Sequence, residues 1–238
     1  MKPNFALNFT DTSIALLHRT AKGWLKIGET PFDAPDLTEA LDYLRKTALG
    51  LEPQGFATKL VIPNSQILYA EVEATGPDAE SRLEQIAAAL ETRTPLTRDE
   101  MIFDWAGDGP LLQVAAVARE TLAEAEDFAT THRFNPVSFV AIPENGTYLG
   151  EPWFGPTAAA PGLIDSGEAV ERDAEAIMPL AEGGRRAKAA VQPEPEPETA
   201  PQPEPEPEPE PTPVPAPDPG PDPSLPPELP EPPAPAHP

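Results

Sequence analysis

The sequence contains no cysteine, which excludes disulfides, thiol catalysis and thiolate metal sites. Positive charge is also scarce, with 16 Lys and Arg against 40 Asp and Glu and a net charge of −24. Nucleic acids and anionic membrane surfaces are bound mainly through clusters of Lys and Arg. The basic cluster of Arg185, Arg186 and Lys188 adjoins an acidic stretch. We therefore expect no nucleic-acid partner.

Long apolar runs are absent too. None approaches the roughly 18 to 20 residues that span a bilayer. The apolar start at Phe5 is interrupted by Asn8, Thr10 and Asp11, unlike the continuous core of a signal peptide. These absences predict no membrane insertion and a cytoplasmic location.

Proline and carboxylates are abundant, and they concentrate toward the C-terminus. Residues 191–238 hold 22 of the 36 prolines and 11 carboxylates, with no Lys or Arg. Such a segment cannot bury enough apolar surface to offset the entropy of ordering the chain. Alternating Pro and Glu over 193–211 favours an extended polyproline II conformation. We predict a disordered, acidic, proline-rich tail that acts as a spacer.

The preceding residues carry regular patterns. Apolar alternation and turn residues predict strands over 5–9, 14–17, 24–27, 58–63, 66–72, 101–105, 111–118 and 137–142. Apolar residues at helical spacing predict helices over about 37–50, from about 83 to just before Pro95, and over 121–131. Asp36 and Glu39 have the spacing of a capping box at the first helix.

This order of elements predicts an α/β fold in which helices cover a mixed sheet. About 150 residues suffice for an independent core, so we expect one domain over 1–157. Residues 158–190 lose strong periodicity and are interpreted as a linker, with spacing over 168–180 that is compatible with a short helix.

Two stretches resemble a known family when they are taken together. Residues 4–17 (NFALNFTDTSIALL) have the strand-turn-strand layout that opens actin-like ATPase domains. Within 59–105, LVIPNSQILYAEVEA and RLEQIAAALETRTPLTRDEMIFDW resemble the actin-like cytoplasmic domains of the type IV pilus protein PilM and the type II secretion protein GspL. The resemblance implies an actin-like, ribonuclease-H-like fold that serves as a cytoplasmic scaffold for partner segments.

The whole chain also resembles a family of alphaproteobacterial proteins that often carry the label "translation initiation factor 2". A translational GTPase needs a G-x-x-x-x-G-K-[ST] loop, whose backbone amides hold the phosphates. The sequence contains no such loop. The label's function is therefore not supported by the residues.

The resemblance to actin-like ATPases directs attention to the first hairpin, which in those proteins carries D-x-G-[TS]. Here Asn8 stands in place of the Asp and Thr10 in place of the Gly, followed by Asp11. Asn cannot supply an anionic metal ligand, and a side chain at the glycine position would crowd the phosphates. The sequence thus predicts a degenerate phosphate hairpin that binds no nucleotide cofactor.

The remaining candidate residues favour no catalytic or metal site. His18, His132 and His237 are far apart and have no ligand partner at i+3 or i+4.

Asp104 and Trp105 fit either an acid beside a docking aromatic or an ordinary strand end. Trp153 and Phe154 either hold the following linker against the domain or form a docking patch for a partner.

The sequence therefore favours a non-enzymatic scaffold or interaction module, built on a degenerate actin-like domain with an acidic spacer tail. We expect a protein partner and no cofactor. Two alternatives stay open, namely an actin-like ATPase completed by a second domain in trans, and a translation-associated factor.

Overall fold

The structure is a computed structural model that describes residues 1–144 and 146–180. All of these lie in the first of two units, Met1–Arg186. The predicted tail over 191–238 and the basic cluster of Arg185, Arg186 and Lys188 lie outside the described residues.

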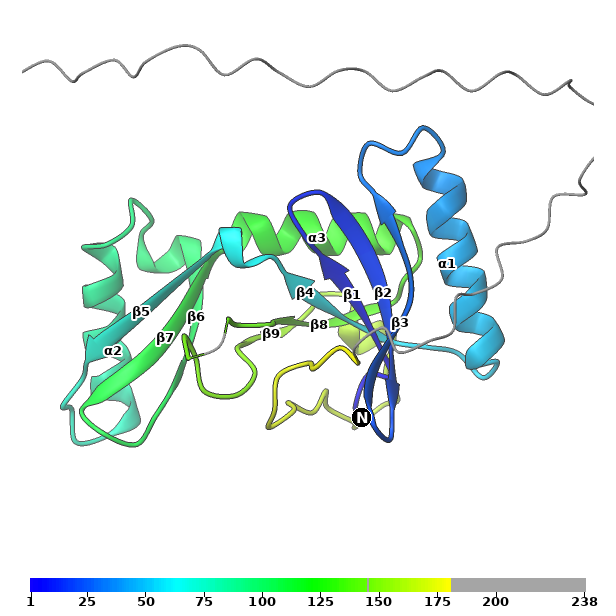
Figure 1. Cartoon of the computed structure of the whole chain (residues 1–238). Coiled ribbons are helices and arrows are strands. Elements are labelled where there is room, and N and C mark those ends of the chain that lie inside the picture. Colours follow the sequence, from blue (N-terminus) through cyan, green and yellow to red (C-terminus); the bar gives the residue numbers. More distant parts are fainter. Residues whose placement is uncertain (145, 181–238) are drawn as a thin grey trace, which may run out of the picture. The chain divides into compact units, whose positions relative to one another are not determined.

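A six-stranded mixed sheet forms the centre of this unit, in the order β3-β2-β1-β4-β8-β9 (Figure 1). Strands β1, β2 and β3 form an antiparallel meander, whereas β1, β4 and β8 are mutually parallel and β9 returns antiparallel to β8. The strands are β1 Phe5–Phe9, β2 Ser13–Thr20, β3 Gly23–Pro31, β4 Thr58–Ile62, β8 Pro136–Ala141 and β9 Trp153–Pro156. The parallel strands β1, β4 and β8 therefore end at the same edge of the sheet.

A smaller antiparallel sheet is inserted between β4 and β8, in the order β5-β7-β6. Its strands are β5 Ile67–Glu73, β6 Met101–Ala106 and β7 Leu111–Ala118. Helix α2 (Ala79–Glu91) packs its buried residues Ile86 and Leu90 on one face of this sheet. Gly107, with φ of 114°, allows the tight turn between β6 and β7. The insertion thus has an apolar core of its own.

The two other helices cover one face of the large sheet (Figure 1). Helix α1 (Leu37–Leu51) contributes Leu41, Leu44 and Ala48, and α3 (Arg119–Thr131) contributes Leu122 and Ala129. They pack against alternate residues of the four adjacent strands β2, β1, β4 and β8, namely Phe5, Leu7, Phe9, Ile14, Leu16, Leu60, Ile62, Phe139 and Ala141. This helix face holds the largest buried apolar cluster of the described residues.

The opposite face of the large sheet is covered without a helix. Residues 168–180, here named the strap, lie extended across it, and Ile177 packs with Ala6, Leu17, Trp24, Val61 and Val140. Trp24 donates its backbone N–H to the Met178 carbonyl (3.2 Å), and Leu180 donates to the Trp24 carbonyl (2.8 Å). The strap thus forms one parallel bridge to the edge strand β3.

Three sequence predictions are corrected here. The spacing over 168–180 forms no helix, because polar contacts to the sheet hold this segment extended. Residues 158–180 are not a free linker, since they pack on the domain that was predicted to end at 157. Asp36 makes no side-chain cap to α1, whereas Asp78 does cap α2 by accepting from the Ser81 backbone N–H.

The mixed α/β sheet with flanking helices is confirmed. Among the helices of residues 1–144 and 146–180, none is long and apolar enough to cross a bilayer.

Candidate functional site

The shared edge of β1, β4 and β8 is the place where the fold concentrates loop residues. In open α/β sheets, ligands bind beyond the carboxyl ends of the parallel strands. Here the β1–β2 turn, the short 3-10 helix Asn64–Gln66 and the loop after β8 meet at this edge. We therefore take this edge as the candidate site.

The β1–β2 turn is organised by the hydroxyl of Thr10. Its Oγ1 accepts the backbone N–H of Ser13 at 2.9 Å and lies 2.9 Å from the Ser13 hydroxyl. Asp11 accepts a hydrogen bond from Ser65 of the neighbouring loop. Thr10 therefore has a structural role in this turn.

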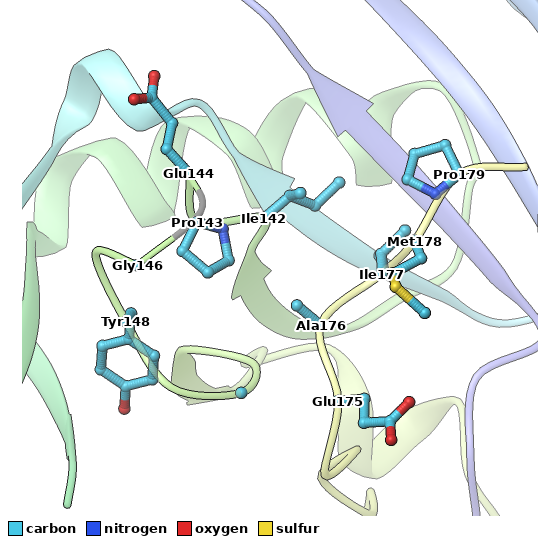
Figure 2. A pocket seen from close by; sticks show the side chains of 11 residues that line it. Ile142, Pro143, Glu144, Gly146, Tyr148, Glu175, Ala176, Ile177, Met178 and Pro179 are labelled. Atoms are coloured by element: carbon cyan, nitrogen blue, oxygen red, sulfur yellow. The ribbon is translucent and has the colours of Figure 1, made fainter. Parts of the chain in front are cut away.

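Two adjoining grooves follow this edge, and we name them together the edge groove. One, of about 680 Å³, lies beside the β1–β2 turn and is lined by Asn8, Thr10 and Asp11. The other, of about 730 Å³, lies between the loop after β8 and residues 175–179 of the strap (Figure 2). Both are lined by Ile142, Glu144 and Pro179, which makes them continuous.

The lining of the edge groove is apolar and acidic. Ile142, which is partly buried, and Met178, which is 67% exposed, supply apolar surface. Carboxylates come from Asp11, Glu144 and Glu175, and among the residues that the structure describes no Lys or Arg lines the groove. Burial raises the pKa of the Tyr69 hydroxyl, and the negative charge of Glu144 adds to this increase. The groove therefore carries negative potential beside an apolar surface.

Below the strap lies a cluster of buried charges that the sequence did not reveal. Lys59 of β4 is 2% exposed and donates to both Glu151 and Asp173, each at 2.6 Å. Arg19 of β2 donates hydrogen bonds from both terminal nitrogens to the Asp173 carboxylate, at 3.2 and 2.6 Å. Lys2 approaches the same carboxylate at 3.3 Å. One strap carboxylate thus lies among three cations.

Two residues of this cluster have opposite titration behaviour. Burial would raise the pKa of Asp173, but the hydrogen bonds and charges of Arg19 and Lys59 hold it well below its ordinary value. For Glu151, burial prevails over the attraction of Lys59 and raises the pKa to about 7. The Oε2 of Glu151 and the Oγ of Ser138 are buried without a hydrogen-bond partner. Asp173 is the firmly ionised acid of the cluster.

Asp104, one of the sequence candidates, joins the two sheets. From β6 it accepts the Tyr148 hydroxyl at 2.6 Å, the Trp153 backbone N–H at 2.9 Å and the Arg172 guanidinium at 2.7 Å. Burial and the hydrogen bond to Asp104 raise the pKa of Tyr148. Asp104 thus connects the inserted sheet to β9 and to the strap.

The aromatic candidates are separated by the structure. Trp105 is half-buried and packs against the α2 cluster of the inserted sheet, with Phe103 at 6.5 Å between ring centroids. Trp153 and Phe154 form the edge strand β9, where Trp153 is half-buried and Phe154 is 2% exposed. The prediction that Phe154 could dock a partner is wrong, because its side chain lies in the core.

The residues that the sequence did not single out are Lys59, Glu151, Asp173 and Glu144. A lysine inside the apolar run 58–63 was the available signal, since Lys is almost never fully buried unless it is paired. Within the described residues, no group of three or more His, Asp or Glu side chains is placed to hold a metal ion.

No protein-family model and no curated protein matches the sequence. Several solved structures do match the chain. The cytoplasmic domain of EpsL, an inner-membrane component of the type II secretion system of Vibrio cholerae, aligns with 60% of this chain at 17% identity and a TM-score of 0.45. A PilM–PilN type IV pilus biogenesis complex aligns with 58% at 16% identity and a TM-score of 0.43.

Both are secretion or pilus proteins of the kind that the sequence motifs resemble. The chain covers 60% of the first solved chain and 46% of the second. An overlap of this size and identity shows neither a shared partner nor a shared activity.

Proposed function

We propose that this chain is a non-enzymatic interaction module, which docks a segment of a partner protein in the edge groove. The observation that carries the proposal is the composition of the groove lining, where the described residues include three carboxylates and exposed apolar surface but no Lys or Arg. Residues 191–238 then serve as an acidic spacer between this module and its point of attachment.

The same lining argues against a nucleotide. A triphosphate needs cations or a bound metal beside it, and backbone amides that it can approach closely. Asn8 offers no anionic metal ligand, and Thr10 places a side chain where close approach is needed. Asp11 and Glu144 add negative charge on either side. Electrostatic repulsion therefore opposes the binding of ATP.

Charge complementarity defines the partner segment. The groove is open to solvent and lies between the loop after β8 and residues 175–179 of the strap (Figure 2). A segment with Lys or Arg side chains could pair with Glu144 and Glu175, while its apolar side chains cover Ile142 and Met178. The net charge of −24 would also accelerate encounter with a basic partner.

Fluorescence anisotropy with two labelled probe peptides tests the proposal. One probe alternates Lys and Leu, and the other alternates Glu and Leu. We expect the Lys–Leu probe to bind the full chain, and Glu144→Gln with Glu175→Gln to weaken it about tenfold. Glu84→Gln with Asp108→Asn neutralises two exposed carboxylates elsewhere and is the matched control. Equal loss in both double variants would contradict a role for the groove.

Calorimetry with ATP and Mg²⁺ tests the non-enzymatic part separately. We expect no measurable heat of binding to the native chain. Micromolar affinity would overturn this part of the proposal, and it would favour an ATPase completed in trans. Asn8→Asp with Thr10→Gly shows whether these two residues alone prevent binding.

A further inference from the structure

The strap is held on the sheet as a bound peptide is held on a receptor. Across residues 168–180, only Asp173 and Ile177 are buried, four residues apart. Open grooves flank it on both sides, of about 730 Å³ toward the loop after β8 and about 350 Å³ toward β2 and β3. A segment that belonged to the core would bury most of its apolar side chains. The strap is instead held by these two buried side chains, by the ion pair of Arg172 with Asp104 and by a few backbone bonds.

The sheet side of this contact is a binding site for a carboxylate, formed by Arg19 and Lys59. Arg19 presents a bidentate guanidinium, which is the arrangement that best recognises a carboxylate. Lys59, itself 2% exposed, adds a buried cation. Both cations also lie over the Trp24 ring, with Arg19 Cζ at 4.4 Å and Lys59 Nζ at 5.1 Å from its centroid.

The second anchor occupies an apolar part of the same face. Ile177 is 2% exposed and packs with Leu17, Trp24, Val61 and Val140. Backbone recognition completes the arrangement, because Trp24 exchanges hydrogen bonds with Met178 and Leu180 in the manner of an added strand. Charge, apolar contact and edge pairing together define what can bind here.

The charge balance shows that this site requires an anion from outside the sheet. Without Asp173, this face would hold the buried cation Lys59 and the partly buried cation Arg19 against the single acid Glu151. An unpaired buried cation is unfavourable. A carboxylate on an extended segment is therefore needed, whether it comes from the strap or from another chain.

We propose that the sheet face beneath the strap is a binding site for an extended acidic segment of a partner protein, and that the strap is its internal competitor. The ligand carries a carboxylate for Arg19 and Lys59 and an aliphatic side chain four residues later. The inference does not rest on the proposed function, but strap residues 175–179 also line the edge groove, so displacement of the strap would alter that groove as well. Binding of the partner displaces the strap and so exposes Asp173.

A peptide with the sequence of residues 168–180, labelled with a fluorophore, tests the proposal on the full chain. In the native chain the tethered strap fills the site at a high effective concentration, so micromolar peptide should bind weakly. Asp173→Asn weakens the strap and leaves Arg19 and Lys59 in place. We expect this variant to bind the peptide at least about tenfold more tightly than the native chain does.

Three controls define the site. A peptide with Asn in place of its Asp should lose the binding, and Arg19→Gln in the Asp173→Asn chain should abolish it. Asp165→Asn, an exposed carboxylate outside the strap, should produce no gain. A folded Asp173→Asn chain, verified by circular dichroism, that binds no better than the native chain would overturn the proposal.

If Asp173→Asn does not fold, Ile177→Ala gives the same measurement without leaving a buried cation unpaired. A peptide of residues 193–211 that binds equally well would show that charge alone is recognised, which would overturn the specific site. A native dimer that dissociates on Asp173→Asn would assign the site to the strap of a second copy and overturn a foreign partner.

Discussion

Consecutive residues of β4 send their side chains to opposite faces of the large sheet, and the two faces are covered differently. Leu60 lies under α1 and α3 on the helix face, among apolar side chains. Lys59 lies under the strap, among paired charges. The helix face is sealed by two amphipathic helices, whereas the strap face is covered by a segment with two buried side chains.

This difference between the two faces shows that the interactions that stabilise the domain are not those that make a face selective for its binding partner. Apolar burial is non-directional and contributes most of the folding free energy. Buried ion pairs contribute less net stability, because desolvation offsets much of their attraction, but they tolerate only a fitting partner. We therefore expect the strap to open locally at a lower free energy than the domain unfolds.

The largest expected effect is on the helix face. Leu60→Ala removes a fully buried side chain at the centre of the cluster. It should lower the free energy of unfolding by about 4 kcal/mol, since the cavity collapses only partly. Urea denaturation followed by circular dichroism measures this. A loss below about 1 kcal/mol would mean that the two faces do not differ as described.

The neighbouring substitution Lys59→Met addresses the strap face. It should lower the free energy of unfolding by about 3 kcal/mol, since Glu151 and Asp173 lose a shared cation. Adding Glu151→Gln should recover part of this loss, because the buried acid is then neutral. The same urea experiment gives the coupling between the two sites. Additive losses would contradict a direct interaction.

The pH dependence of stability should reveal Glu151. Its pKa is raised by burial from 4.5 to about 7, so the folded state holds a proton that the unfolded state loses at lower pH. Its contribution is complete below pH 4.5 and is lost as the pH rises through about 7. The free energy of unfolding from urea denaturation should therefore fall between pH 5 and 8. Its slope against pH should correspond to the release of up to about one proton.

Glu151→Gln should remove that slope and serves as the control. Asp173 has the opposite sign, because its lowered pKa stabilises the fold above pH 3.8 and the contribution is lost as the pH falls further. A slope that persists in Glu151→Gln would place the titrating group elsewhere.

The smallest change in global stability is expected in the strap. Ile177→Ala should cost about 1 kcal/mol or less, because the strap can detach while the helix face stays packed. Hydrogen exchange at the Glu171 and Leu180 amides, which bond to Met1 and Trp24, should accelerate about tenfold. Met178→Ala, at a 67% exposed side chain, should change neither quantity. Equal exchange in both variants would contradict Ile177 as an anchor.

Local patterns were sufficient for most of the fold. Strand 111–118 matches β7, and the predicted helix over 37–50 differs from α1 by one residue. These elements carry their own periodicity, so neighbours in sequence specify them. Strand β9 was missed, since four residues that include Gly155 and Pro156 carry no alternation to detect. Its position depends on pairing with β8.

The candidate site was less accessible from sequence. Asn8, Thr10 and Asp11 do line the edge groove, because the end of β1 is fixed by its hairpin. The contact between Lys59 and Asp173 joins residues 114 positions apart, and no local rule pairs them. The helical spacing over 168–180 was outweighed by these distant contacts, since a short isolated helix is marginal in water.

The strap also changes how the sheet ends. Strand β3 is an outer strand, and an outer strand with free backbone groups can pair with another chain and start aggregation. Met178 and Leu180 occupy the backbone groups of Trp24, and the Lys26–Glu29 ion pair places charge farther along the strand. A chain with a detached strap should therefore self-associate more readily in concentrated storage, even where its melting temperature is unchanged.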